Sequence, residues 1–173
     1  MYTSIKDLAE RAGYLGGAGA VMDINTGEMI AMTSYTEYSS SVMSIRNDST
    51  QIRAYEKNKA KPFINRVVSG LYTPGSIVKP FIALGALNED IISPEKQIYS
   101  SGKIELVSPY DKNIVYTYKD NKAHGWVDMR HAIAVSSNIY FYTIGGGFED
   151  QPGIGIDKIG YYTNLFGLDE KTG

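Results

Sequence analysis

Residues 70–88 decide the fold of this protein, and they read GLYTPGSIVKPFIALGALN. A turn that contains Pro74 and Gly75 leads into a segment whose apolar residues cover nearly the whole circumference of a helix. A helix with that pattern is typically buried on all sides rather than lying on a surface. We therefore predict a core helix from Ser76 to Asn88 that begins directly after the Pro-Gly turn.

The start of this predicted helix carries a Ser-x-x-Lys pair, Ser76 and Lys79, which places a hydroxyl and an amine on one helical face. Burial lowers the pKa of a lysine, so a neutral Lys79 amine could take the proton of Ser76 and make it a nucleophile. Free backbone N–H groups at the helix N-terminus suit an oxyanion. The alternative is that Ser76 only caps the helix while the Lys79 side chain extends to water.

Spacing alone does not single out this pair, because Ser-x-x-Lys occurs twice more, at Ser93/Lys96 and Ser100/Lys103. Ser93 precedes Pro94 and is typical of the capped start of a single helical turn. Ser100 lies in a turn, where no helix holds the lysine. We interpret both pairs as solvated surface.

A second polar group, Ser136-Ser137-Asn138, interrupts two apolar segments that we predict as helices. Burying the Ser136 hydroxyl and the Asn138 carboxamide costs free energy unless these groups form hydrogen bonds with each other, with Lys79 or with a ligand. One interpretation is therefore a polar cluster that faces Ser76. The other is ordinary capping chemistry at a helix junction.

The remaining segments predict an α+β organisation. We expect a helix over 1–11, a β-hairpin over 20–32, a long functional or mobile loop over 34–62, a hairpin over 103–118, helices over 129–135 and 139–144, and a last helix over 156–166 that Gly167 ends.

Five other titratable residues have no partner at a spacing typical of catalysis. Asp23, Asp128 and Asp157 are typical of turn or cap positions, and Asp128 precedes a predicted helix. His124 and His131 fit neither metal-ligand spacing nor a Ser/His/Asp order. We interpret all five as structural.

Composition excludes several classes of function. The 173 residues include 17 basic and 19 acidic side chains, and a net charge of -2 leaves no broad cationic face for nucleic acid. The absence of cysteine removes disulfides, thiolate catalysis and zinc-thiolate sites. No G-x-G-x-x-G follows a predicted strand, and we expect no cofactor. The chain shows neither a secretory leader nor an apolar span of about 20 residues, so we expect no membrane anchor in it.

Taken in order, the motifs resemble the transpeptidase domain of penicillin-binding proteins, and most closely the elongation-type class B enzymes. The stretches that carry the resemblance are Asn65-Arg66, residues 70–80, residues 124–128 and Ser136-Ser137-Asn138, with the hairpin over 20–32 ahead of them. The resemblance implies the α+β fold of penicillin-binding proteins and serine β-lactamases, a five-stranded antiparallel sheet beside a helical lobe. Residues 1–173 would be a partial transpeptidase domain, with the opening hairpin, much of the helical lobe and an incomplete central sheet.

The resemblance also assigns roles to four residues of this chain. Ser76 would be the acylated nucleophile and Lys79 its proton acceptor, while Ser136 and Asn138 would form the second motif, which shuttles the proton and holds the substrate amide. The substrate implied is a peptidoglycan stem peptide ending in D-Ala-D-Ala, and β-lactams would acylate the same serine. The parent protein would be membrane-anchored at the extracytoplasmic face of the bacterial membrane, with cell-wall elongation partners.

The third motif of the family departs from this pattern. Lys171-Thr172-Gly173 spells it, but it follows the last predicted helix directly and lies too close to Asn138. We interpret it as a look-alike and expect the chain to stop before the true third motif. This chain, unlike its parent, is therefore expected to acylate poorly or not at all.

Two other functions fit parts of the same pattern. A serine β-lactamase or a β-lactam sensor would share the first motifs. A non-catalytic structural or interaction module would keep the fold without the chemistry.

Overall fold

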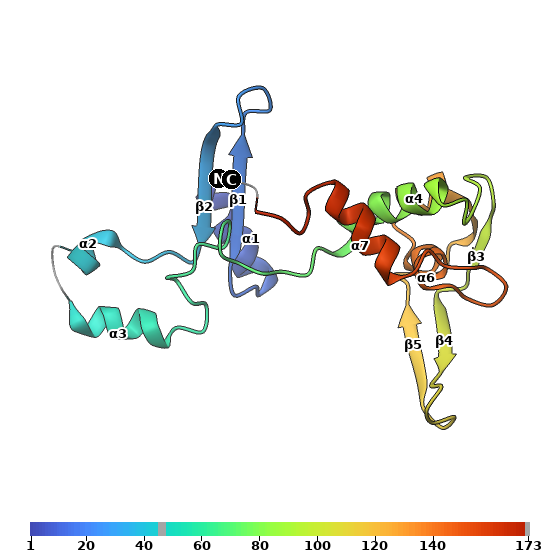
Figure 1. The fold of residues 1–173 in the computed structure, drawn as a ribbon. Coiled ribbons are helices and arrows are strands. Elements are labelled where there is room, and N and C mark those ends of the chain that lie inside the picture. The colour runs from blue at the N-terminus through green and yellow to red at the C-terminus, as the bar shows by residue number, and fades with distance from the viewer. Residues whose placement is uncertain (45–47, 172–173) are drawn as a thin grey trace. The chain divides into compact units, whose positions relative to one another are not determined.

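The computed structural model describes residues 1–44 and 48–171, and the chain divides into two compact units, Met1–Thr73 and Pro74–Gly173 (Figure 1). Each unit combines helices with antiparallel strands, as the predicted α+β class requires. None of the helices in the two described ranges is long and apolar enough to cross a membrane.

The first unit is built on a β-hairpin. Its strands β1 (Gly17–Met22) and β2 (Met29–Tyr35) pair antiparallel, and helix α1 (Tyr2–Ala12) packs against them. Gly17 permits this close packing, because a Cβ at that position would meet the Ile5 side chain at 2.7 Å. The helix and the hairpin predicted near the N-terminus are therefore both confirmed.

The prediction of a continuous loop over 34–62 is wrong in part, because helices α2 (Ser40–Ser44) and α3 (Ser49–Lys57) occupy much of it. The carboxylate of Asp48 caps α3 by accepting two backbone N–H groups, each at 3.1 Å. Neither helix buries a residue. In these two helices only Val42, Ile52 and Tyr55 are half-buried, so the apolar periodicity of the sequence is weak there.

The second unit contains the hydrophobic core. Its helical elements are the 3₁₀ turn η1 (Gly75–Val78) and the helices α4 (Lys79–Asn88), α5 (Met129–Ala134), α6 (Asn138–Gly146) and α7 (Ile156–Leu165). The core cluster consists of Ala83, Ala86, Ile92, Val127, Met129, Ala132, Tyr140, Phe141 and Ile144. Most of these side chains come from α4, α5 and α6, with Ile92 after α4 and Val127 in strand β6 (Gly125–Val127), so the core holds α4 against α5 and α6.

Two short antiparallel ladders complete the second unit. Strand β3 (Ile98–Ser100) pairs with β6 (Gly125–Val127), and β4 (Lys103–Val107) pairs with β5 (Val115–Lys119). The second ladder confirms the hairpin predicted over 103–118. All the strands in the described ranges form two-stranded sheets, in agreement with the predicted incomplete central sheet.

Helix α4 differs from the prediction in its start and in its exposure. The turn η1 precedes it, and the α-helix begins at Lys79. Pro80 lacks an N–H, but at the first turn of a helix most N–H groups have no intrahelical acceptor, so at most one helical hydrogen bond is lost. Ala83 and Ala86 are buried on the same side as Lys79, but Leu84 is 45% exposed. The prediction of burial on all sides is therefore wrong for this helix.

We predict opposite effects for two glycine-to-alanine substitutions in this unit. At Gly85 in α4 a Cβ would lie 2.7 Å from Ile154 and Tyr162, so Gly85→Ala should lower the free energy of unfolding by about 1–3 kcal/mol. At Gly160 in α7 an added Cβ would have no neighbouring atom within 4 Å, so Gly160→Ala should raise the free energy of unfolding by about 0.5–1 kcal/mol. Urea unfolding followed by circular dichroism measures both changes. Effects of the same sign would contradict the packing of α4 on α7.

Candidate active site

Ser76 lies in η1, at the exposed entrance to α4. The preceding Gly75 has a φ of 65°, a left-handed conformation that glycine adopts without strain. The main-chain carbonyl of Ser76 accepts the N–H of Lys79, where the 3₁₀ turn becomes the α-helix. The Ser76 hydroxyl is thus accessible from solvent at a helix start, where backbone N–H groups are free to meet a developing negative charge.

The ammonium of Lys79, in contrast, is buried, and the residue is only 7% exposed. Its Nζ donates to three oxygens: the Ser136 carbonyl at 2.6 Å, Ser136 Oγ at 3.0 Å and Asn138 Oδ1 at 2.7 Å. The centroid of the Phe141 ring lies 5.6 Å from the same nitrogen. Three acceptors match the three N–H groups of an ammonium. The interpretation in which Lys79 extends to water is therefore wrong.

Ser136 connects the lysine to the serine. Its hydroxyl accepts a hydrogen bond from Lys79 Nζ and donates one to Ser76 Oγ at 2.9 Å. The residue lies between α5 and α6 with a φ of 57°, a conformation that is uncommon for residues other than glycine. In this conformation both its carbonyl and its hydroxyl bind Lys79. The hydrogen bonds therefore run from Lys79 to Ser76 through the Ser136 hydroxyl.

Asn138 is the first residue of α6, and both ends of its amide are held. The Oδ1 atom accepts from Lys79, while Nδ2 donates to the main-chain carbonyl of Lys119 at 3.2 Å, at the end of β5. These contacts orient the amide with its oxygen toward the ammonium. Between the two motif residues, Ser137 is buried and caps α6 by accepting the N–H of Tyr140.

Burial lowers the pKa of Lys79 below its ordinary 10.5, because desolvation disfavours the charged amine. The negative charge of Asp120 opposes this change and raises the pKa. Burial also tends to raise the pKa of Asp120 itself, but hydrogen bonds from the backbone of Asn138 and Ile139 outweigh it and keep that pKa below 3.8. Lys79 therefore loses its proton more readily than a solvated lysine, although a buried counter-charge lies near it.

Asp120 is the residue that sequence reasoning missed. It directly follows β5, and a carboxylate at the end of a predicted strand just before His124-Gly125 was the available signal. The interpretation of Ser100 as solvated surface is also wrong. Ser100 is fully buried, and its hydroxyl donates to Asp120 Oδ2 at 3.2 Å.

The other members of the two discarded Ser-x-x-Lys pairs lie outside the site. Lys103 is exposed and forms an ion pair with Glu105 at 2.7 Å, as the surface interpretation predicts. Ser93 and Lys96 are exposed, as the surface interpretation predicts, and the Ser93 carbonyl accepts the Lys96 N–H at 3.2 Å. The single turn predicted there is present, although it does not continue into a longer helix.

The histidines and the third-motif lysine are also outside the cluster. The His124 side chain is 3% exposed, with Nε2 2.8 Å from Asn121 Oδ1, while His131 is exposed on α5. Lys171 is exposed and follows α7 outside any helix or strand; Thr172 and Gly173 lie outside the described residues.

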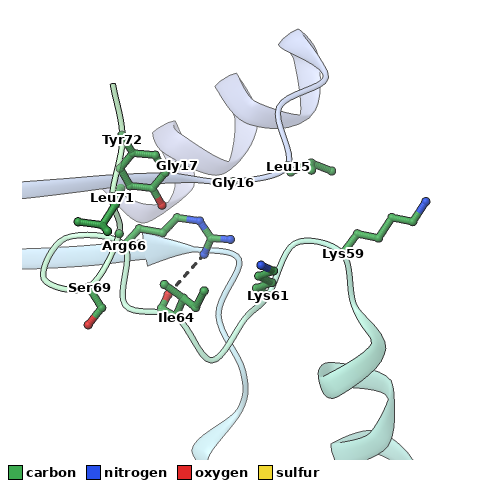
Figure 2. Close-up of a pocket in the computed structure, with 12 residues that line it drawn as sticks. Leu15, Gly16, Gly17, Lys59, Lys61, Ile64, Arg66, Ser69, Leu71 and Tyr72 are labelled. Carbon is green, nitrogen blue, oxygen red and sulfur yellow. Dashed lines mark hydrogen bonds between the residues drawn. The ribbon is translucent and has the colours of Figure 1, made fainter. Parts of the chain in front are cut away.

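A pocket of about 790 Å³ in the first unit contains none of the four predicted site residues (Figure 2). Lys59, Lys61 and Arg66 line it, and such cations are typical of anion sites. The Arg66 guanidinium, however, donates to the Ser34 hydroxyl and to two main-chain carbonyls. Figure 2 shows the Lys59 side chain pointing away from Arg66. We therefore take the Ser76 cluster as the candidate site and interpret this pocket as part of the framework.

Comparison with known proteins identifies the family of this chain. Residues 17–173 match the family model of the penicillin binding protein transpeptidase domain. The chain belongs to this family. Peptidoglycan D,D-transpeptidase MrdA of Haemophilus influenzae is 31% identical to it over 161 residues, which are 92% of this chain and 23% of that protein.

Solved structures of family members have the same fold. The penicillin-binding protein PBP2 of Helicobacter pylori matches with a TM-score of 0.71 and 27% identity, covering 97% of this chain and 30% of that one. The complex of the H. pylori protein with MreC matches with a TM-score of 0.73 and 28% identity over the same shares. This chain therefore spans less than a third of the length of these relatives.

We predict that the burial of Lys79 is visible in the pH dependence of stability. Its pKa is lowered in the folded chain, so between that pKa and 10.5 the unfolded chain binds a proton that the folded chain lacks. The free energy of unfolding, measured relative to Lys79→Met, should therefore rise with pH through this window. Urea denaturation of both proteins at a series of alkaline pH values gives the difference. A difference that stays constant or falls would contradict a buried, desolvated amine.

Proposed function

We propose that this chain carries the acylation site of a serine D,D-transpeptidase that cross-links peptidoglycan, with Ser76 as its nucleophile. One observation carries the proposal: the Ser136 hydroxyl bonds both Ser76 Oγ, at 2.9 Å, and Lys79 Nζ, at 3.0 Å. The family match runs through both compact units, and we propose that they are parts of one transpeptidase domain.

In the proposed reaction, neutral Lys79 takes the proton of the Ser136 hydroxyl as Ser136 takes the proton of Ser76. Ser76 Oγ then bonds to the carbonyl carbon of the penultimate D-alanine, and the oxyanion is met by the backbone N–H of Ser76. The peptide C–N bond breaks, and the leaving D-alanine amine receives the proton from Lys79 through Ser136. An acceptor amine then attacks the ester by the reverse proton route, and Ser76 regains its proton.

The proposed donor substrate is a stem peptide that ends in D-Ala-D-Ala, and β-lactams should acylate the same serine. The H. pylori relative was solved in a complex with MreC. By analogy, we propose that the protein containing this chain acts at the extracytoplasmic face of the bacterial membrane, together with cell-wall elongation partners.

The geometry favours an acyl transferase over the non-catalytic module. A module that had lost its chemistry would have no need to bury a lysine among polar groups, since a buried charge destabilises a fold unless it is fully bonded. A β-lactamase or sensor would use the same serine and lysine, but the curated relatives are D,D-transpeptidases.

The test of the nucleophile is intact-mass measurement after long incubation with excess benzylpenicillin, followed by peptide mapping. We expect slow formation of one adduct on Ser76, complete loss of it in Ser76→Ala, and no change in Ser101→Ala, which alters an exposed serine. Slow acylation is expected because the third motif is interpreted as a look-alike. Rapid stoichiometric formation of an adduct that Ser76→Ala loses would show that the chain is more active than we expect, and an adduct that persists in Ser76→Ala would contradict the assignment of Ser76.

The same assay tests the interpretation of Lys171. As an exposed look-alike it contacts no substrate, so Lys171→Ala should acylate at the wild-type rate. A loss of tenfold or more, about 1.4 kcal/mol in the transition state, would show that Lys171 belongs to the site.

A further inference from the structure

Asp120 lies at the centre of a buried hydrogen-bond network beneath the turn that carries Ser136 and Asn138. Its side chain is fully buried. The donors to its Oδ2 atom are Ser137 Oγ at 2.8 Å, Ile139 N at 3.1 Å and Ser100 Oγ at 3.2 Å, and Oδ1 accepts Asn121 N at 2.9 Å. A buried carboxylate with this many donors is held in one orientation.

These donors surround one residue of the site. Ser137 and Ile139 are the neighbours of Asn138 on either side in the chain, and both are tied to the same oxygen of Asp120. The carbonyl of Lys119, one residue before Asp120, accepts the Asn138 Nδ2. The end of β5 therefore fixes both the backbone around Asn138 and the direction of its amide.

The charges of Lys79 and Asp120 are also separated by the residues that Asp120 holds. The oxygens that bind the Lys79 ammonium belong to Ser136 and Asn138, which are neutral, and the ring beside it belongs to Phe141. The negative charge that acts on Lys79 is Asp120, behind these residues. A buried cation and anion separated by bonded polar groups stabilise each other without direct contact.

We propose that Asp120 is a positioning residue of the acylation site: by fixing Ser137 and Ile139, it holds Ser136 and Asn138 where their oxygens bind Lys79. Its effect on rate rests on the proposed function, whereas its effect on Lys79 does not. His124 is the titratable neighbour of Asp120, with Nε2 3.8 Å from Oδ1. Lys79 should therefore be titrated above about pH 8, where an ordinary histidine is neutral.

The experiment compares Asp120→Asn, Asp120→Glu and the wild-type chain by two readouts. The first is the pKa of Lys79, followed by NMR of lysine labelled with ¹³C at Cε and assigned with Lys79→Arg. The second is the pH profile of benzylpenicillin acylation at Ser76. Asp120→Asn removes the charge, so Lys79 should titrate at lower pH, and acylation should slow by roughly tenfold to a hundredfold, as for other partners that orient functional groups.

Asp120→Glu distinguishes the effect of the negative charge from the effect of the carboxylate position. It also provides the test if Asp120→Asn does not fold. It keeps the negative charge, so the pKa of Lys79 should stay closer to the wild-type value than in Asp120→Asn. It displaces the carboxylate from Ser137 and Ile139, so acylation should remain slow. Acylation by Asp120→Glu at the wild-type rate would overturn the proposal.

The matched control is Asp128→Asn, which alters the carboxylate that caps α5 by accepting the His131 N–H at 2.8 Å. It should lower the melting temperature and leave the pKa of Lys79 unchanged. If Asp120→Asn behaves like this control, Asp120 only stabilises the fold and the proposal is wrong. If an adduct forms but persists in Ser76→Ala, the proposed function fails, while the NMR titration still decides whether Asp120 acts on Lys79.

Discussion

The buried ammonium of Lys79 is the constraint on which the rest of the site depends. A charge with so little exposure is tolerated only when its N–H groups are all bonded, since an unpaired buried charge costs several kcal/mol. The three oxygens that accept hydrogen bonds from Lys79 Nζ belong to Ser136 and Asn138, which lie more than 50 residues further along the chain. The strained conformation of Ser136 follows from this need, because one residue must turn its carbonyl and its hydroxyl to the same cation.

The core of the second unit holds these groups at bonding distance. Ala83, Ala86 and Ala132 are almost fully buried, and such small side chains allow α4, α5 and α6 to pack closely. Tyr140 and Ile144, both 0% exposed, anchor α6 directly after the motif. The site is therefore built on helix ends fixed by packing: Ser76, in its 3₁₀ turn, is exposed, Ser136 and Asn138 are half-buried, and Lys79 is buried.

Much of this arrangement could be predicted from the sequence. The hairpins, the last three helices and the four residues that meet at the site follow from apolar periodicity, turn residues and the resemblance of the motifs. The bridging position of Ser136 could not, because the left-handed conformation that directs its hydroxyl depends on tertiary packing. Helices α2 and α3 were missed because none of their residues is fully buried, so the sequence carries only a weak apolar periodicity there. Ser100 and Asp120 were missed because their pairing joins β3 to the end of β5, a contact without a local signal.

We propose that Lys79 and Ser136 act on Ser76 as one proton route. A double-mutant cycle on the rate of benzylpenicillin acylation, with Lys79→Met, Ser136→Ala and the double variant, tests it most directly. If the two residues form one route, removing either should cost nearly as much as removing both, so the double variant should be little slower than the slower single variant. Losses that simply multiply would show that Lys79 and Ser136 act independently, and would contradict the connection through the Ser136 hydroxyl.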